Sequence, residues 1–208
     1  FIFISKKRRD SFIYWSNENV EFGHCMYTPS DFKENNPSEI VQFLNHNSLG
    51  IIISSTGVFE PIVSHIPFLV AQENEDLILE GHIAVLNPQV EHLRKGKTCM
   101  VVFQGPNTYI SSSVYTHENV PTWNYQAVHV YGTVEEMTAV ELEQHLKLSV
   151  EKFESRRHKQ LHFEQFSPSM IAAYSKEIHG VRIRSYKTEV AFKMSQNRSE
   201  VDYKNIVD

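Results

Sequence analysis

Short apolar runs separated by turn residues follow one another between Leu49 and Gly105, and they limit the folds open to this chain. The runs are each about the length of a strand: GIIISS, PIVSHIPFLV, LILEGHIA and KTCMVVFQG. Strands joined by short turns pair with their neighbours, so this region predicts an antiparallel meander with a turn at Thr56-Gly57. Residues 126–134 and 181–194 continue the strand pattern, whereas the polar stretch 109–125 predicts a long structured loop.

Helix signals lie around this strand-rich region. Four capping residues are each followed within three positions by a proline or an acidic residue: Asn36, Asn87, Thr138 and Ser167. Thr138 opens the longest amphipathic segment, and Gly180 is predicted to end the last helix. Strands cluster and helices are peripheral, which differs from βαβ alternation. We therefore predict an α+β, mainly β fold built on a small closed or half-closed barrel.

Composition and charge exclude several classes of protein. Hydrophobic residues make up 41% of the chain, which is typical of a globular protein, and the net charge of −5 gives no overall attraction to nucleic acid. DNA contact would need a local basic patch, for which residues 156–159 are the candidate, or a partner protein. Cys25 and Cys99 stand alone, so we expect no metal site and no disulfide framework. No apolar run reaches the roughly 20 residues that span a bilayer, so we expect a cytoplasmic protein without membrane contact.

The first 25 residues differ from the rest of the chain. They do not begin with Met, and they show neither strand alternation nor a helical stripe that continues into the following residues. Met26 has the character of a natural start. We expect residues 1–25 to be an N-terminal extension outside the fold, and residues 26–208 to form a single domain. No GxGxxG, Walker A, GxSxG or HExxH motif occurs, which disfavours the common nucleotide-binding, hydrolase and metalloprotease classes.

Five segments, taken in order and spacing, resemble the PaiB family: MYTPSDF at 26–32, SHIPF at 64–68, GHIAVLNPQ at 81–89, VVFQGPNTYISSSVY and VPTWNYQAVHVYG within 101–132, and KMSQNR at 193–198. The resemblance implies a six-stranded antiparallel split β-barrel with peripheral helices, of the pyridoxine-phosphate-oxidase-like kind. It also implies a homodimer that holds FMN in clefts between the subunits. Val114 stands where relatives usually carry Trp, which alters the packing expected of the flavin pocket, and Met194 stands where they carry Leu.

FMN needs donors for its phosphate and a stacking surface with edge hydrogen bonds for its isoalloxazine ring. The helix start at Asn87 is our candidate for the phosphate, because unpaired N–H groups and the helix dipole favour an anion there. Ten residues are predicted to bind the cofactor: His65, His82, Asn87, Gln104, Ser111, Ser112, Trp123, Asn124, Lys193 and Gln196. Each also has a purely structural interpretation, for example Asn87 as a helix cap or Trp123 as a core or interface anchor.

Three functions stay open at this point. The resemblance implies an FMN-binding negative transcriptional regulator, a repressor of protease-synthesis and sporulation-type genes, that contacts DNA directly or through a partner and has no catalytic residue. No recognition helix is evident in the chain to support this. The alternatives are a flavin-dependent oxidoreductase of the pyridoxine-phosphate-oxidase-like class and a partner-binding module without a catalytic role.

Overall fold

The structure is a computed structural model that describes residues 26–55 and 60–208, so the predicted extension and the turn at Thr56-Gly57 lie outside the described residues. Seven strands are present: β1 (Leu49–Ser55), β2 (Pro61–Pro67), β3 (Leu69–Glu73), β4 (Asp76–Ala84), β5 (Thr98–Ile110), β6 (Thr122–Glu136) and β7 (Ile178–Lys193). The helices are α1 (Pro37–His46), α2 (Ala139–Glu154), α3 (Pro168–Ser175) and α4 (Glu200–Val207). Short 3-10 turns are η1 (Ser30–Phe32), η2 (Pro88–His92), η3 (Ser112–Val114) and η4 (Phe163–Gln165).

The strands form one antiparallel sheet in the order β2-β1-β5-β6-β7-β4-β3. The mainly β character is as predicted, but the strand number of six is wrong, and the sheet is not closed into a barrel by any ladder between β2 and β3 in the described residues. The physical reason lies in the run PIVSHIPFLV. Pro67 cannot donate to a ladder, so the run breaks there and its two halves become the opposite edge strands of the sheet.

The sheet is strongly curved, and its concave side, the inner face, encloses the core. Phe68 follows the break at Pro67, and its ring is fully buried in edge contact with Phe103, at 5.7 Å between centroids. Gly50 and Gly81 leave room for that ring, since a Cβ atom at either position would lie within 3.0 Å of it. Burying each such aromatic side chain contributes about 1.5–3 kcal/mol, so this packing holds the two ends of the sheet together.

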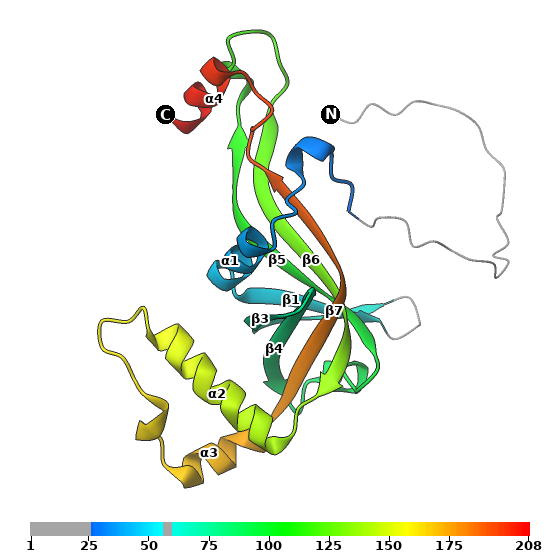
Figure 1. The fold of residues 1–208 in the computed structure, drawn as a ribbon, viewed down its shortest axis with the longest axis vertical. Coiled ribbons are helices and arrows are strands. Elements are labelled where there is room, and N and C mark those ends of the chain that lie inside the picture. Colours follow the sequence, from blue (N-terminus) through cyan, green and yellow to red (C-terminus); the bar gives the residue numbers. More distant parts are fainter. Residues whose placement is uncertain (1–25, 56–59) are drawn as a thin grey trace, which may run out of the picture.

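Strands β5, β6 and β7 continue beyond the curved body as a long arm, with α4 at its tip, whereas α2 and α3 lie at the opposite end (Figure 1). The long loop predicted over 109–125 is therefore shorter, because β5 runs to Ile110 and β6 begins at Thr122. Helix α4 was not predicted. The buried carboxylate of Asp202 ties it to the arm by accepting hydrogen bonds from the backbone N–H and the hydroxyl of Thr116.

Most of the predicted helix caps are present. Asn36 and Ser167 accept hydrogen bonds from backbone N–H groups of the first turns of α1 and α3, and Thr138 forms a reciprocal capping box with Glu141 at the start of α2. The predicted end of the last helix at Gly180 is wrong. Helix α3 ends at Ser175, and Gly180 lies inside β7, where a Cβ atom would be 2.8 Å from the Met137 sulfur.

Candidate functional site

The convex side of the sheet carries two surfaces of different character. Strand register places His65, Ile51, Val102, His129 and Glu189 in one row across five strands, all on the convex side. The rows beside it complete a surface that we call the open half: Leu49, Ile51, Ile53, Val63, His65, Met100, Val102, Gln104, Ala127, His129 and Tyr131. Further along the convex side, α2 packs over a second surface, the covered half: Ile78, Glu80, His82, Gly180 and Arg182.

The open half is largely apolar, and none of the described helices packs over it. Leu49 is 61% exposed, Val63 is also exposed, and Ile51, Ile53 and Val102 are half-buried. Contiguous apolar surface of this kind is often found at interaction sites. A hollow of about 330 Å³ lies on this half, with Ile53, Met100, Tyr131 and Tyr186 in its lining.

Polar groups border the open half on its β6–β7 side. Burial lowers the pKa of His129, against the opposing effect of the Glu189 carboxylate. Burial opposes ionisation of Glu189, but hydrogen bonds from Lys187 and Tyr131 hold its pKa below its ordinary value. His129 was not among the predicted residues, although it lies four positions after Tyr125 and six after Trp123, and strand alternation places it on the same side as both.

On the covered half, the half-buried His82 side chain contacts α2. Its Nδ1 atom lies 3.1 Å from Nε2 of His145, which is 1% exposed. Burial, with the nearby charges of His82 and Arg182, lowers the pKa of His145 to about 4. Arg182 completes this network by donating to Glu80 and to Glu141 of α2 at 2.7–2.8 Å. His145 escaped prediction because no local pattern links it to a partner 63 residues away.

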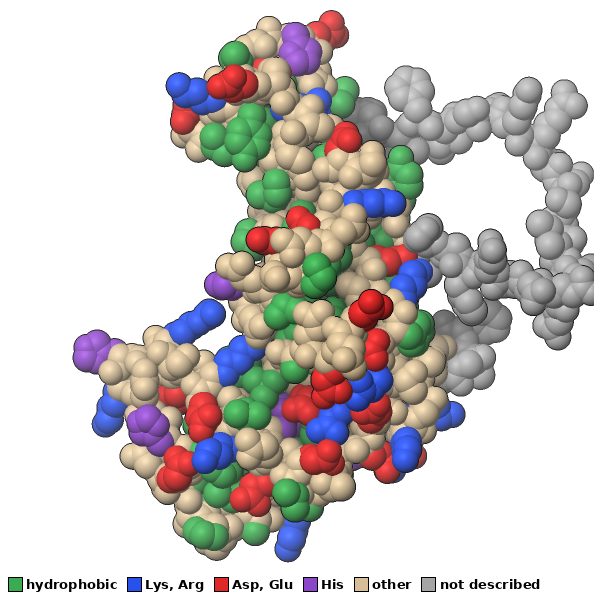
Figure 2. All heavy atoms as spheres, in the orientation of Figure 1, with side chains coloured by type: hydrophobic (Ala, Val, Ile, Leu, Met, Phe, Trp, Pro, Cys, Tyr) green, Lys and Arg blue, Asp and Glu red, His purple; other side chains and the backbone are tan. Residues whose placement is uncertain are grey.

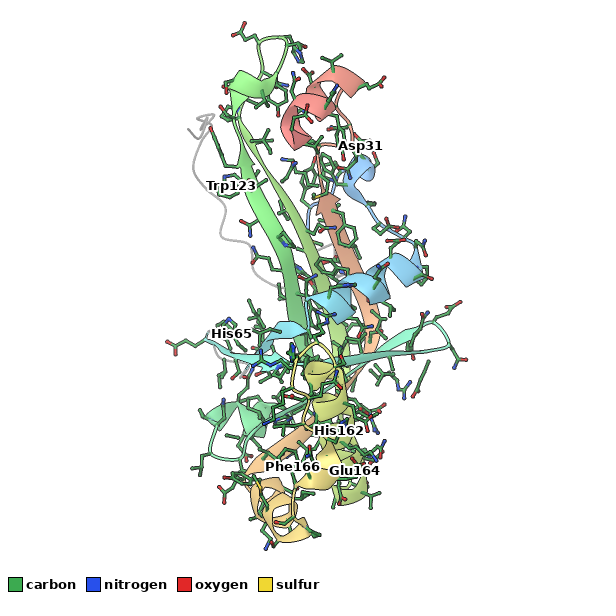
Figure 3. The ribbon with its side chains drawn as sticks, turned by 90° about the vertical axis from the view of Figure 1, so that its left-hand side faces the viewer. Asp31, His65, Trp123, His162, Glu164 and Phe166 are labelled. Atoms are coloured by element: carbon green, nitrogen blue, oxygen red, sulfur yellow. The ribbon has the colours of Figure 1, made fainter. Side chains whose placement is uncertain are left out.

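The other predicted residues divide between the open half and the arm. His65 and Gln104 lie on the open half, and Figure 3 shows His65 and Trp123 on the same side of the molecule, on β2 and on the arm. The Trp123 ring is exposed and meets Tyr109 edge-on. The arm carries six of the ten predicted residues: Ser111, Ser112, Trp123, Asn124, Lys193 and Gln196.

Several of these side chains already have structural partners. Asn124 is buried and accepts from Ser195, Ser111 caps η3, and Gln196 donates to the carbonyl of Phe192. Lys193 donates to the Thr122 hydroxyl. Asn87 accepts from the N–H of Gln89 and donates to Ser64, as a cap would. The single chain therefore does not gather the ten predicted residues into one pocket.

The chemistry of the open half fits a flavin ring. Ile51 and Val102 give a flat apolar floor, and His65, His129 and Gln104 offer imidazole and amide groups at its margins for the edge of the isoalloxazine. Within the described residues, no group of three or more His, Cys, Asp or Glu side chains could hold a metal ion. No helix in the described part of the chain is long and apolar enough to cross a membrane.

A family of proteins described as "Putative FMN-binding domain" matches residues 26–186. The chain belongs to this family. Over 183 residues it is 39% identical to the "Protease synthase and sporulation protein PAI 2" of Bacillus subtilis (strain 168), and the match covers 88% of both chains. An uncharacterized protein of Emericella nidulans, AN0679, is 26% identical over 225 residues, covering 88% of this chain and 89% of that one. The resemblance to PaiB is confirmed, and FMN is the cofactor that the family description names.

Solved structures bear out the fold. The conserved hypothetical protein Rv2991 of Mycobacterium tuberculosis superposes with a TM-score of 0.59 at 16% identity, covering 84% of this chain and 95% of that one. The flavocytochrome Anf3 of Azotobacter vinelandii gives 0.58 at 13% identity, covering 83% and 75%. Because the sequence identities are this low, the superpositions show a shared fold and nothing about function.

Proposed function

We propose that this chain is a homodimeric FMN-binding protein of the PaiB type that acts in the cytoplasm as a negative transcriptional regulator, with residues 26–208 working as one domain. The observation that carries the proposal is the open half, an apolar sheet surface over which no helix of residues 26–55 and 60–208 packs. A homodimer is the simplest cover for it, because a two-fold axis lets the same patch meet its own copy.

FMN binding follows from the same surface. The ring would lie on the floor at Ile51 and Val102, with hydrogen bonds from His65 and Gln104 to its edge. Trp123 would stack or close the site, and Lys193 with Ser111 and Ser112 would supply donors to the phosphate from the arm of either subunit. Bound FMN supplies the redox chemistry of a flavin, and these residues bind and orient it.

The regulatory part of the proposal is supported by the similarity to a Bacillus subtilis protein named for protease synthesis and sporulation. Since the net charge is −5, direct DNA contact would depend on the exposed basic residues 156–159 after α2, or on a partner protein. A flavin-dependent oxidoreductase and a partner-binding module remain the alternatives that an experiment should separate.

The first experiment measures flavin content and mass of the purified full chain together. We expect a yellow dimer that releases FMN on denaturation. Ile51→Asp should give a colourless monomer, whereas Leu161→Asp, at an exposed apolar position outside the open half, should leave both properties unchanged. A wild-type monomer, or a dimer that fails to take up added FMN, would overturn the proposal.

A second experiment tests regulation. We expect a salt-sensitive gel shift with DNA upstream of the regulated genes, weakened by a combined Arg156→Gln and Arg157→Gln substitution. NAD(P)H oxidation by the flavin-loaded dimer without any DNA binding would instead favour the oxidoreductase.

A further inference from the structure

A groove of about 330 Å³ lies where the C-terminal half of α2 departs from the β3–β4 hairpin. Leu69, Ala71 and Ile78 belong to its floor, and Leu148 of α2 to its wall. Figure 2 shows basic and hydrophobic side chains together beside the hollow between α2 and the sheet. The groove borders the covered half and shares no residue with the open half, so it is separate from the proposed flavin surface.

The wall of the groove is apolar but unfilled. Leu148 is 40% exposed, even though it faces the hairpin. One turn earlier, the same face of α2 is closed against the sheet by His145. The apolar surface that α2 leaves uncovered here is therefore available to an aliphatic group.

The acidic side chains that line the groove are paired with arginines, whereas its lysine is not paired with a carboxylate in the described part of the chain. Both carboxylates in its lining already have partners, because Glu80 pairs with Arg182 at 2.7 Å and Glu73 with Arg184 at 3.1 Å. The Lys152 ammonium donates to the neutral Asn45 amide at 2.7 Å, and no carboxylate of the described residues pairs with it. Burial, with the nearby Arg156 charge, lowers the pKa of Lys152, as expected for a cation that lacks an anion.

We propose that this groove binds an aliphatic monocarboxylate of medium chain length, with the tail on Leu69, Ala71 and Leu148 and the carboxylate on Lys152. A carboxylate would give the partly buried ammonium a charge-assisted hydrogen bond. The groove volume lies near the lower limit of the roughly 300–1,000 Å³ of small-molecule sites, which favours a single chain over a larger ligand.

The test uses the full-length protein and titrates it calorimetrically with octanoate, decanoate and decanol, all below the concentration at which they aggregate. Each buried methylene should tighten binding about four-fold, so decanoate should bind about ten-fold or more tightly than octanoate. Decanoate should also bind at least about ten-fold more tightly than decanol, because only the acid can satisfy Lys152.

Lys152→Met should remove the preference for decanoate over decanol, and Lys176→Met, an exposed lysine next to α3, should keep it. Leu148→Asp should weaken all three ligands, with thermal unfolding as the check on folding. Equal affinity for decanoate and decanol in the unaltered protein would overturn the proposal without any variant. Absence of binding, or binding that Leu148→Asp does not weaken, would also overturn it, and bound FMN should not change in any of these titrations.

Discussion

The two halves of the convex surface belong to different strands of one sheet and follow the same alternation, yet a helix covers only one of them in the described residues. Ile78 on the covered half is 3% exposed, whereas Leu49 on the open half is 61% exposed. The difference is α2, which Arg182 joins to β4 through Glu80 and Glu141. His65 and His82 were equivalent as candidates in the sequence, but the first faces outward and the second is packed under a helix. Alternation thus predicts which side chains share a surface and does not predict what covers that surface.

The largest difference in stability should appear when an aspartate is placed on each half in turn. Ile78→Asp places a carboxylate at a buried position beside Arg184, which already pairs with Glu73 and Glu135, so we expect a loss of about 4 kcal/mol or more in the free energy of unfolding. Ile51→Asp should lower the unfolding free energy of the isolated chain by less than about 1 kcal/mol and act instead on dimer mass and flavin content. Urea unfolding with light scattering measures both. Similar losses of stability in the two variants would show that the open half is packed in the monomer.

The next largest effect should be on the pH dependence of stability, to which His145 on the covered half contributes. His145 has a folded-state pKa of about 4, below its ordinary value of 6.5. Between these values the unfolded chain takes up a proton that the folded chain does not, so stability falls as the pH falls through this window. The loss amounts to at most about 3 kcal/mol and is absent above the window.

Chemical unfolding measured from pH 7.5 to pH 4 tests this expectation in matched variants. His145→Gln should flatten the profile, since the buried imidazole is removed, and His129→Gln on the open half should flatten it less, because the Glu189 carboxylate there opposes the effect of burial. An unchanged acid dependence in His145→Gln would contradict the assignment of this titration to the covered half.

A smaller difference in unfolding free energy is expected between substitutions of two arginines that lie two residues apart on β7. Arg182 has a side chain 21% exposed and joins β4 to α2, so Arg182→Gln should lower the unfolding free energy by about 1–2 kcal/mol. Arg184 is 37% exposed and pairs with Glu73 and Glu135 at the margin, so Arg184→Gln should cost less than about 1 kcal/mol. Thermal unfolding of the two variants compares them, and an equal or reversed order would show that the Arg182 network does not hold α2.

Sequence patterns within a few residues of one another predicted much of the fold. The caps at Asn36, Thr138 and Ser167 and most strand positions follow from patterns within a few residues, which act before tertiary contacts form. Three features were missed. The break at Pro67 is a local effect of the missing N–H, and the sequence pattern could have indicated it. The other two depend on distant contacts: the arm extends β5 and β6 through polar sequence, and α4 is held by Asp202 against Thr116, 86 residues earlier.

For the candidate site, the family resemblance identified the cofactor. Alternation within the strands could also have shown which of the predicted residues share one side of the sheet. Trp123 and His129 share one side of β6, whereas Asn124 faces the other side and is buried with Ser195. Alternation along β6 could therefore have removed Asn124 from the surface that carries Trp123, and it could have added His129 to the predicted residues. It could not have placed His82 under α2, since that contact joins residues 63 positions apart.

The smallest effect is expected at Asn87, which caps η2 and belongs to neither half. Its side-chain oxygen accepts from the N–H of Gln89, a role that a carboxylate performs equally well, and the bond that its amide donates to Ser64 can be replaced by one that the Ser64 hydroxyl donates. If Asn87 is only a cap, Asn87→Asp should change FMN affinity by less than about two-fold and stability by less than about 1 kcal/mol. Fluorescence titration with FMN measures the affinity, with Ser64→Ala as the control for loss of this hydrogen bond. A ten-fold or greater loss in Asn87→Asp alone would mean that negative charge at this position repels the phosphate, and would assign Asn87 to the flavin site.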